Sequence, residues 1–231
     1  MPTIIRKCEV RMKLARPDIR HPRIVLAGNG DEAGLVTALR KRGLHARWMS
    51  WDDPDTMHAD LVILRAGADG RLDEFLTWSR RVPNLLNAPD VVAWNTTERY
   101  LRDLAQTGVP TQVDAIAEPT ALVFLGGTQS HAFTRRRSVD ADFELWDVGY
   151  AALDAAARHL GIGTGELLYA RADVTGGPPD ARLASLDLVG PTLGWELLDH
   201  AGREVAERQF AVCVESALER LGLGPFSHRR P

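Results

Sequence analysis

Short apolar runs of strand length alternate with helix-length amphipathic stretches between residues 23 and 108. Parallel strands need a crossover between them, usually a helix, so this alternation predicts a parallel sheet flanked by helices. No other feature constrains the fold as strongly. The strand-like runs are residues 23–27, 46–51 and 60–64, and the helix-like stretches are residues 32–42, 72–82 and 95–108.

The second half of the chain follows a different pattern, in which strand-like runs succeed one another directly. Residues 121–125 and 129–134 are separated by Gly126 and Gly127, and residues 167–174 and 182–189 are separated by a turn-rich stretch. Two successive hairpins predict antiparallel pairing.

Four helices carry specific expectations about their faces and ends. Asn95 and Glu98 have the spacing of a capping box, which predicts a helix start. Residues 143–160 and 201–221 are helical by periodicity. Side chains expected to face the core are Leu72, Phe75, Leu76 and Val82 in one helix, and Val205, Phe210, Val212, Val214 and Leu218 in the last.

These patterns predict an α/β fold whose second half is of the α+β type. Residues 23–112 form a parallel α/β lobe, and residues 113–223 form a lobe with antiparallel hairpins and helices. Residues 1–22 are a basic lead-in, and residues 224–231 are a tail.

Charge and composition exclude several classes of function. The 231 residues include 28 Lys and Arg and 31 Asp and Glu, which gives a net charge of -3 and no overall attraction to nucleic acid. No run approaches the 18 or so apolar residues of a membrane helix. Two cysteines, Cys8 and Cys213, form neither a disulfide framework nor a zinc motif, so we expect a cytoplasmic protein.

The turn Gly28-x-Gly30-x-x-Ala33 follows the first strand and precedes a helix, as in dinucleotide-binding proteins. Asp52 and Asp53 follow about 20 residues later, where such proteins hold the ribose. Asp31 and Glu32 would nevertheless repel a pyrophosphate at the helix start. A plain tight turn is therefore the favoured interpretation, with nicotinamide binding as the alternative.

Six fragments, in order, resemble the ATP-grasp ligases, and together they cover most of residues 23–222. They are DLVILR, RLDEFLTWSRRV, LLNAPDVVAWNTTERYLRDLAQTGVPT, ALVFLGGTQSHAFTRRR, LLYARADV and ARLASLDLVGPTLGWEL. The resemblance implies a front lobe of the pre-ATP-grasp type and a reduced ATP-grasp back lobe. It also implies ligation of a carboxylate to an amine through an acyl phosphate made from ATP, with magnesium at the phosphates.

The sequence departs from this family where the nucleotide would bind. The resemblance places a phosphate-binding lysine at the position of Glu98, so the charge is reversed. It also places a small β-rich lobe between residues 112 and 121, and ten residues span at most about 33 Å when fully extended. The nucleotide lid is therefore expected to be missing.

The metal-binding acids implied by the resemblance map onto Asp173, Ser185, Asp187 and Gly190. Positions 185 and 187 share one face of a strand, where two oxygen ligands can hold one ion. Serine and glycine remove two of the carboxylates, which weakens such a site. Asp173 and Asp187 are either a residual metal site or two solvated acids.

Polar side chains remain on the back lobe. His131, Arg135 and Arg137 alternate along one expected strand, and Tyr169, Arg171 and Asp173 alternate along another. Arginine forks bind carboxylate or phosphate, so we expect a ligand site at His131, Arg135, Tyr169 and Arg171, together with Arg65 at the end of the DLVILR run.

We therefore expect a pseudoenzyme that has lost ATP-dependent ligation, with no catalytic residue and no cofactor. It would bind a protein partner, a second copy as a homodimer, or a small anionic ligand. Two alternatives remain: an active carboxylate-amine ligase that uses ATP and magnesium and is completed by another chain, or a nicotinamide-dependent enzyme.

Overall fold

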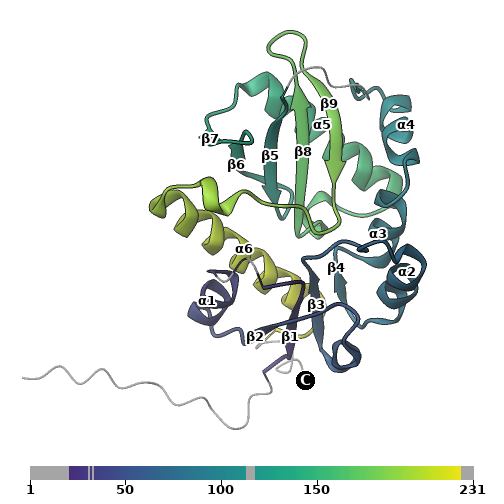
Figure 1. Ribbon diagram of the computed structural model, residues 1–231, viewed down its shortest axis with the longest axis vertical. Helices are drawn as coiled ribbons and strands as arrows, with labels where there is room; N and C mark the ends of the chain where they lie inside the picture. Colours follow the sequence, from purple (N-terminus) through teal and green to yellow (C-terminus); the bar gives the residue numbers. More distant parts are fainter. Residues whose placement is uncertain (1–20, 31, 33, 113–117, 225–231) are drawn as a thin grey trace, which may run out of the picture.

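The computed structural model describes residues 21–30, 32, 34–112 and 118–224, in which two sheets and their helices surround a shared core (Figure 1). The expected lead-in, all but the start of the tail, and Asp31 and Ala33 of the glycine turn lie outside the described residues. The elements in chain order are β1 (Ile24–Ala27), α1 (Gly34–Lys41), β2 (Ala46–Met49), η1 (Pro54–His58), β3 (Leu61–Leu64), α2 (Leu72–Arg81), β4 (Leu85–Leu86), α3 (Pro89–Asn95), α4 (Arg99–Gln106), β5 (Thr120–Leu125), β6 (Thr128–Phe133), β7 (Ser138–Val139), α5 (Phe143–Leu160), η2 (Thr164–Glu166), β8 (Tyr169–Thr175), β9 (Arg182–Asp187), η3 (Trp195–Leu197) and α6 (His200–Arg220).

The first sheet has the strand order β2-β1-β3-β4, and all its pairs are parallel. Strands β1 and β3 are buried along their whole length, as expected for a parallel sheet covered on both faces. In this sheet, β2 and β3 lie on opposite sides of β1, so the chain reverses its direction across the sheet after β2. The switch point of the sheet thus lies between the carboxyl ends of β1 and β3.

The second sheet has the order β7-β6-β5-β8-β9 and is antiparallel, which confirms both predicted hairpins and the α/β fold class. One face carries Leu122, Phe124, Ala170 and Ala172 and packs with α5. Residues 107–119 connect α4 to β5, and no third sheet lies in the described part of the chain.

Helix α6 joins the two halves, although it comes last in the chain. Its buried Phe210, Val214 and Leu218 share one apolar cluster with residues of both sheets, including Leu26 and Val123. In Figure 1, α6 crosses between the two sheets beside α1. The core is therefore continuous from one sheet to the other.

Three expectations about helices are wrong. Val205 and Val212 are 62% and 40% exposed, because they lie on the face of α6 opposite the buried Phe210 and Val214, and Leu72 is 41% exposed at the first turn of α2. Asn95 ends α3 instead of beginning a helix. Glu98 stands at the start of α4 without a side-chain cap hydrogen bond.

Two buried asparagines connect the lobes through their amides. Asn87, fully buried, donates to the carbonyls of Tyr169 (3.0 Å) and Leu188 (2.9 Å) and accepts from Leu168 N–H (2.7 Å). Asn95 donates to Leu186 and accepts from Leu188 N–H. Each amide satisfies backbone groups that no strand neighbour reaches.

The change Asn87→Ala is expected to lower the free energy of unfolding by about 3–4 kcal/mol, because three buried backbone groups lose their partner. Urea unfolding with linear extrapolation measures the loss. The exposed Asn29→Ala is the matched control and should stay within about 0.5 kcal/mol of the parent. A loss below about 1 kcal/mol for Asn87→Ala would contradict the assigned role of this amide.

Candidate functional site

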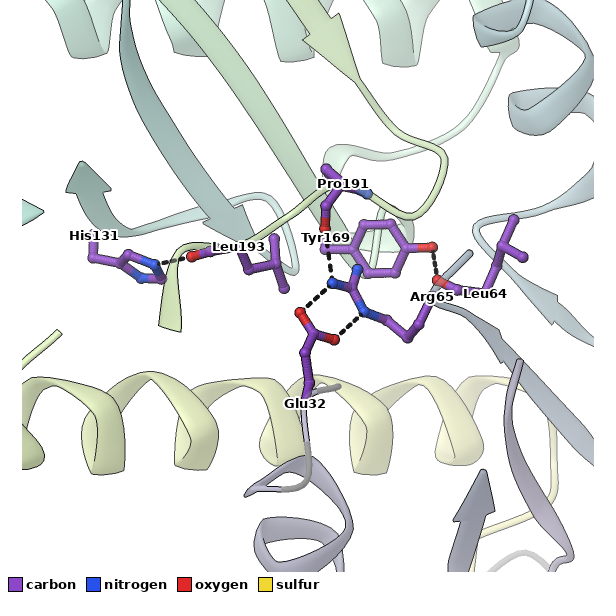
Figure 2. Close-up of polar contacts among 7 residues, drawn as sticks. All are labelled: Glu32, Leu64, Arg65, His131, Tyr169, Pro191 and Leu193. Atoms are coloured by element: carbon purple, nitrogen blue, oxygen red, sulfur yellow. Dashed lines mark hydrogen bonds and ion pairs between the residues drawn. The ribbon is translucent and has the colours of Figure 1, made fainter. Parts of the chain in front are cut away.

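The carboxyl ends of β1 and β3 meet the back lobe at a buried ion pair (Figure 2). Arg65, which follows β3, donates from Nε and Nη2 to the two carboxylate oxygens of Glu32, at 2.7 and 2.6 Å. Nη2 also donates to the Pro191 carbonyl at 2.7 Å, and the Arg65 side chain is only 2% exposed. Burial works to lower the pKa of Arg65, but Glu32 outweighs it and the pKa is raised, so the guanidinium stays charged.

Tyr169 lies against this ion pair and is fully buried. The Arg65 guanidinium is 4.9 Å from the centre of its ring, and its hydroxyl donates to the Leu64 carbonyl. Burial raises the pKa of the phenol, which therefore stays protonated. The structure thus places Arg65 and Tyr169, two of the expected ligand residues, in the junction between the lobes and away from solvent.

Arg171 on β8 is paired within the protein. Its Nε and Nη2 donate to the two oxygens of Asp173, at 2.8 and 3.0 Å, and Ser185 donates to the same carboxylate at 2.9 Å. Both oxygens of Asp173 are thus engaged. Asp187, opposite Arg171 in the sheet, accepts from Val189 N–H at 3.0 Å, and burial raises its pKa.

The metal expected from the resemblance does not fit this arrangement. A divalent cation needs free carboxylate oxygens, and Arg171 occupies those of Asp173 with a positive charge. Within the described ranges, no group of three or more His, Cys, Asp or Glu side chains could hold a metal ion.

Glu98 and Gly190 differ in what the structure does with them. The Glu98 side chain is exposed and forms no cap. Gly190 has φ +61°, and a Cβ atom there would lie 2.7 Å from the Ala66 carbonyl oxygen. Position 190 is thus committed to a close contact between the lobes.

Arg135, Arg136 and Arg171 line one pocket of about 690 Å³, here called the arginine pocket. Phe133 forms part of its wall, 5.5 Å from the Arg171 guanidinium, and Glu118 and Glu196 also line it. Arg135 does not lie on a strand as expected, because β6 ends at Phe133.

Arg137 also lies beyond β6, in a turn where Thr134 N–H donates to the Arg137 carbonyl at 2.9 Å. His131 is on β6 but lines a neighbouring pocket of about 610 Å³, here called the histidine pocket. The structure therefore brings Arg135 and Arg171 together and separates them from His131.

A third pocket, of about 390 Å³, lies at the switch point of the parallel sheet. Glu32, Trp48 and Arg65 line it, and it shares Thr192 and Glu196 with the arginine pocket. The sequence offers the glycine turn beside this crevice as a nicotinamide site but favours a plain tight turn, and the structure places Asn29 and Gly30 of that turn in the pocket wall. Asp52 and Asp53 do not line it: Asp52 accepts from Ser50 and pairs with Arg71, and Asp53 caps η1. The two acids that the nicotinamide alternative assigned to the ribose thus lie outside this pocket.

Replacing Arg65 with alanine is expected to lower the free energy of unfolding by about 3–5 kcal/mol, because Glu32 is left partly buried without a counter-ion. The matched control is Arg42→Ala, which breaks a second Arg-Glu pair whose side chains are each 35% exposed. That change should cost about 1 kcal/mol or less. If urea unfolding gives equal losses of unfolding free energy for the two variants, burial does not make the Arg65–Glu32 pair more stabilising than the exposed pair.

Comparisons with known proteins place these features in context. Residues 16–87 match a family model described as the N-terminal domain of D-cycloserine synthetase DcsG. No curated protein matches the chain. Solved structures share its fold at low sequence identity, including the following three.

The crystal structure of D-cycloserine synthetase DcsG has 20% identity and a TM-score of 0.72, and the match covers 86% of this chain and 99% of that one. A RimK domain ATP-grasp protein from Sphaerobacter thermophilus has 12% identity and a TM-score of 0.59, with 83% and 98% covered. The ATP-grasp ligase PsnB, complexed with its precursor peptide PsnA2 and AMPPNP, has 12% identity and a TM-score of 0.57, with 88% and 99% covered. The resemblance expected from the six sequence fragments is thus confirmed at the level of the fold: this chain has the fold of the ATP-grasp ligases.

Proposed function

We propose that this protein has lost ATP-dependent ligation and binds a small anionic ligand in the arginine pocket. The observation that carries the proposal is the gathering of Arg135, Arg136 and Arg171 around one hollow. Arg135 and Arg136 are exposed, and neither guanidinium forms an ion pair with another described residue. Glu118 and Glu196 also line the pocket, but neither pairs with these two guanidinium groups, which therefore remain available to an anion.

Three departures support the loss of ligation. Asp173 is held by Arg171 and Ser185, so it does not offer free oxygens to magnesium. Glu98 presents a negative charge where the resemblance implies a lysine for the phosphates. Residues 107–119 leave little chain for a nucleotide lid. Phosphoryl transfer needs charge neutralisation, positioning and shielding, and each departure affects one of them.

The pocket also indicates the shape of the ligand. Planar guanidinium groups bind carboxylate and phosphate oxygens in pairs, and the Phe133 ring offers an apolar surface beside them. Glu118 accepts from Arg135 N–H at 3.1 Å, which fixes the turn that carries the arginines. A compact di- or tricarboxylate matches these features, so citrate is a suitable probe.

Magnesium-ATP at millimolar concentration is expected to leave the melting temperature unchanged. A ligand at 100 times its Kd would add about 2.7 kcal/mol, or roughly 5–10 °C at this chain length. Differential scanning calorimetry with and without magnesium-ATP measures the difference. A saturable rise would instead support the alternative of an ATP-dependent ligase completed by another chain.

Citrate is expected to raise the melting temperature of the parent protein in a saturable way. The double change Arg135→Ala with Arg136→Ala should weaken its apparent affinity at least about tenfold, because each charged hydrogen bond contributes roughly 1.5–3 kcal/mol. Citrate also stabilises proteins without binding, so the difference between variants is the result that counts. Arg182→Ala, an exposed arginine of β9 outside the pocket, is the control and should behave like the parent. An identical response in all three proteins would exclude the arginine pocket as the site.

A further inference from the structure

Ser130 and His131 occupy an irregular position in β6. His131 pairs with Val123 of β5, and Gln129 pairs with Phe124, so Ser130 is an extra residue in a β-bulge. Bulges redirect side chains out of the regular alternation of a strand and are common beside active sites. Here the two neighbouring side chains meet, with Ser130 Oγ 3.1 Å from His131 Nδ1.

The hydrogen bonds around His131 determine which ring nitrogen carries the proton. Nε2 lies 2.6 Å from the carbonyl oxygen of Leu193 (Figure 2), and a carbonyl only accepts, so Nε2 must be protonated. Burial lowers the pKa of His131, which leaves the ring neutral at neutral pH. Nδ1 is therefore an acceptor, and the Ser130 hydroxyl donates to it.

The bulge is held from two helices. Gln129 N–H donates to the Tyr150 hydroxyl on α5 at 3.2 Å, and Gln209 on α6 donates to the Gln129 carbonyl at 3.3 Å. Leu193 is also fixed, because Gly194 lies so close to Phe133 that a Cβ atom would be 2.5 Å from its ring. The serine, the imidazole and the carbonyl are thus positioned in advance, as a reactive group requires.

A pocket is present beside these groups. Ser130 and His131 both line the histidine pocket of about 610 Å³, together with Arg137 and Trp146. Pockets of this size accommodate small organic ligands. Arg137 adds a positive charge to the pocket lining, Asp140 and Asp199 add negative charges, and Trp146 supplies an apolar wall.

We propose that Ser130 is a nucleophile, with His131 as its general base, for acyl transfer from small esters bound in the histidine pocket. A nucleophile within hydrogen-bond reach of a base, which is itself oriented by a third group, is the general geometry of activated hydroxyls. The proposal goes beyond the proposed function, because it concerns a different pocket and a reaction that uses neither ATP nor metal.

The reaction balances within the residues present and water. Ser130 Oγ bonds to the ester carbonyl carbon as its proton moves to His131 Nδ1, and the bond to the leaving alcohol breaks as that proton is returned to the alcohol oxygen. Water then gives a proton to His131 Nδ1 and its oxygen to the acyl carbon. The acid is released as Ser130 recovers its proton.

A fluorophosphonate bearing a fluorophore tests the proposal directly on the full-length protein. The Ser130 Oγ–P bond would form as the P–F bond breaks, with the serine proton passing to His131 and fluoride leaving. Ser138 is the internal control, because it lines the same pocket but only donates weakly to the Ala132 carbonyl at 3.4 Å. Mass spectrometry of the labelled peptides is expected to find Ser130 modified at least about 100-fold faster than Ser138, the low end of general-base effects.

Two variants separate a reactive pair from an accessible hydroxyl. Ser130→Ala should abolish the labelling, and His131→Gln should reduce it at Ser130 by a similar factor of about 100. Both must retain the circular dichroism spectrum and melting temperature of the parent within a few degrees. Site mapping on the parent protein decides the result if either variant fails to fold. Equal labelling of the two serines, or no labelling of Ser130, would overturn this proposal. Either result would leave the anion site proposed in the arginine pocket unaffected.

Discussion

A buried positive charge must be neutralised where it lies, because removing an ion from water costs several kcal/mol even after the protein relaxes. Arg65 meets this requirement with partners from three separate parts of the chain: Glu32 after β1, the Pro191 carbonyl after β9, and the ring of Tyr169 on β8. The two hydrogen-bonding partners engage Nε and Nη2, while Nη1 is buried without a hydrogen-bond partner among the described residues. This side chain, together with the amides of Asn87 and Asn95, therefore bonds the two sheets to each other beside the pockets along residues 190–197.

Much of the fold could be predicted because hydrophobic periodicity is a local property of the chain. The buried strands β1 and β3, the two hairpins and helix α5 follow directly from it. The failures occurred where a distant contact overrides the local signal. Asn95 has the sequence of a cap, but its amide is used by Leu186 and Leu188 in the other lobe. The exposure of Val205 has a different cause: helical spacing puts it on the face of α6 opposite Val214, so it could not share the buried face with that residue.

The candidate site was only partly accessible to sequence reasoning, for two physical reasons. Alternation along a strand correctly places Arg171 and Asp173 on one face. The same alternation suggested that both side chains face a shared ligand, but in the structure they form an ion pair with each other. Alternation also assumes an unbroken strand. The end of β6 moves Arg135 into a turn, and the bulge brings Ser130 beside His131 instead of onto the opposite face. Neither a β-bulge nor an ion pair between side chains can be recognised from the amino-acid sequence alone.

The contact between Gly190 and Ala66 excludes a carboxylate side chain from position 190. Restoring a carboxylate at position 190 would require a left-handed backbone for a side chain that disfavours it and would place Cβ against a backbone carbonyl. A single substitution there therefore damages the lobe junction. Accommodating a larger side chain would require the segment after β3 to move, and Arg65 anchors this segment. The close approach of two backbones thus fixes the residue at position 190 as firmly as a core contact does, because any side chain there gives a less stable protein.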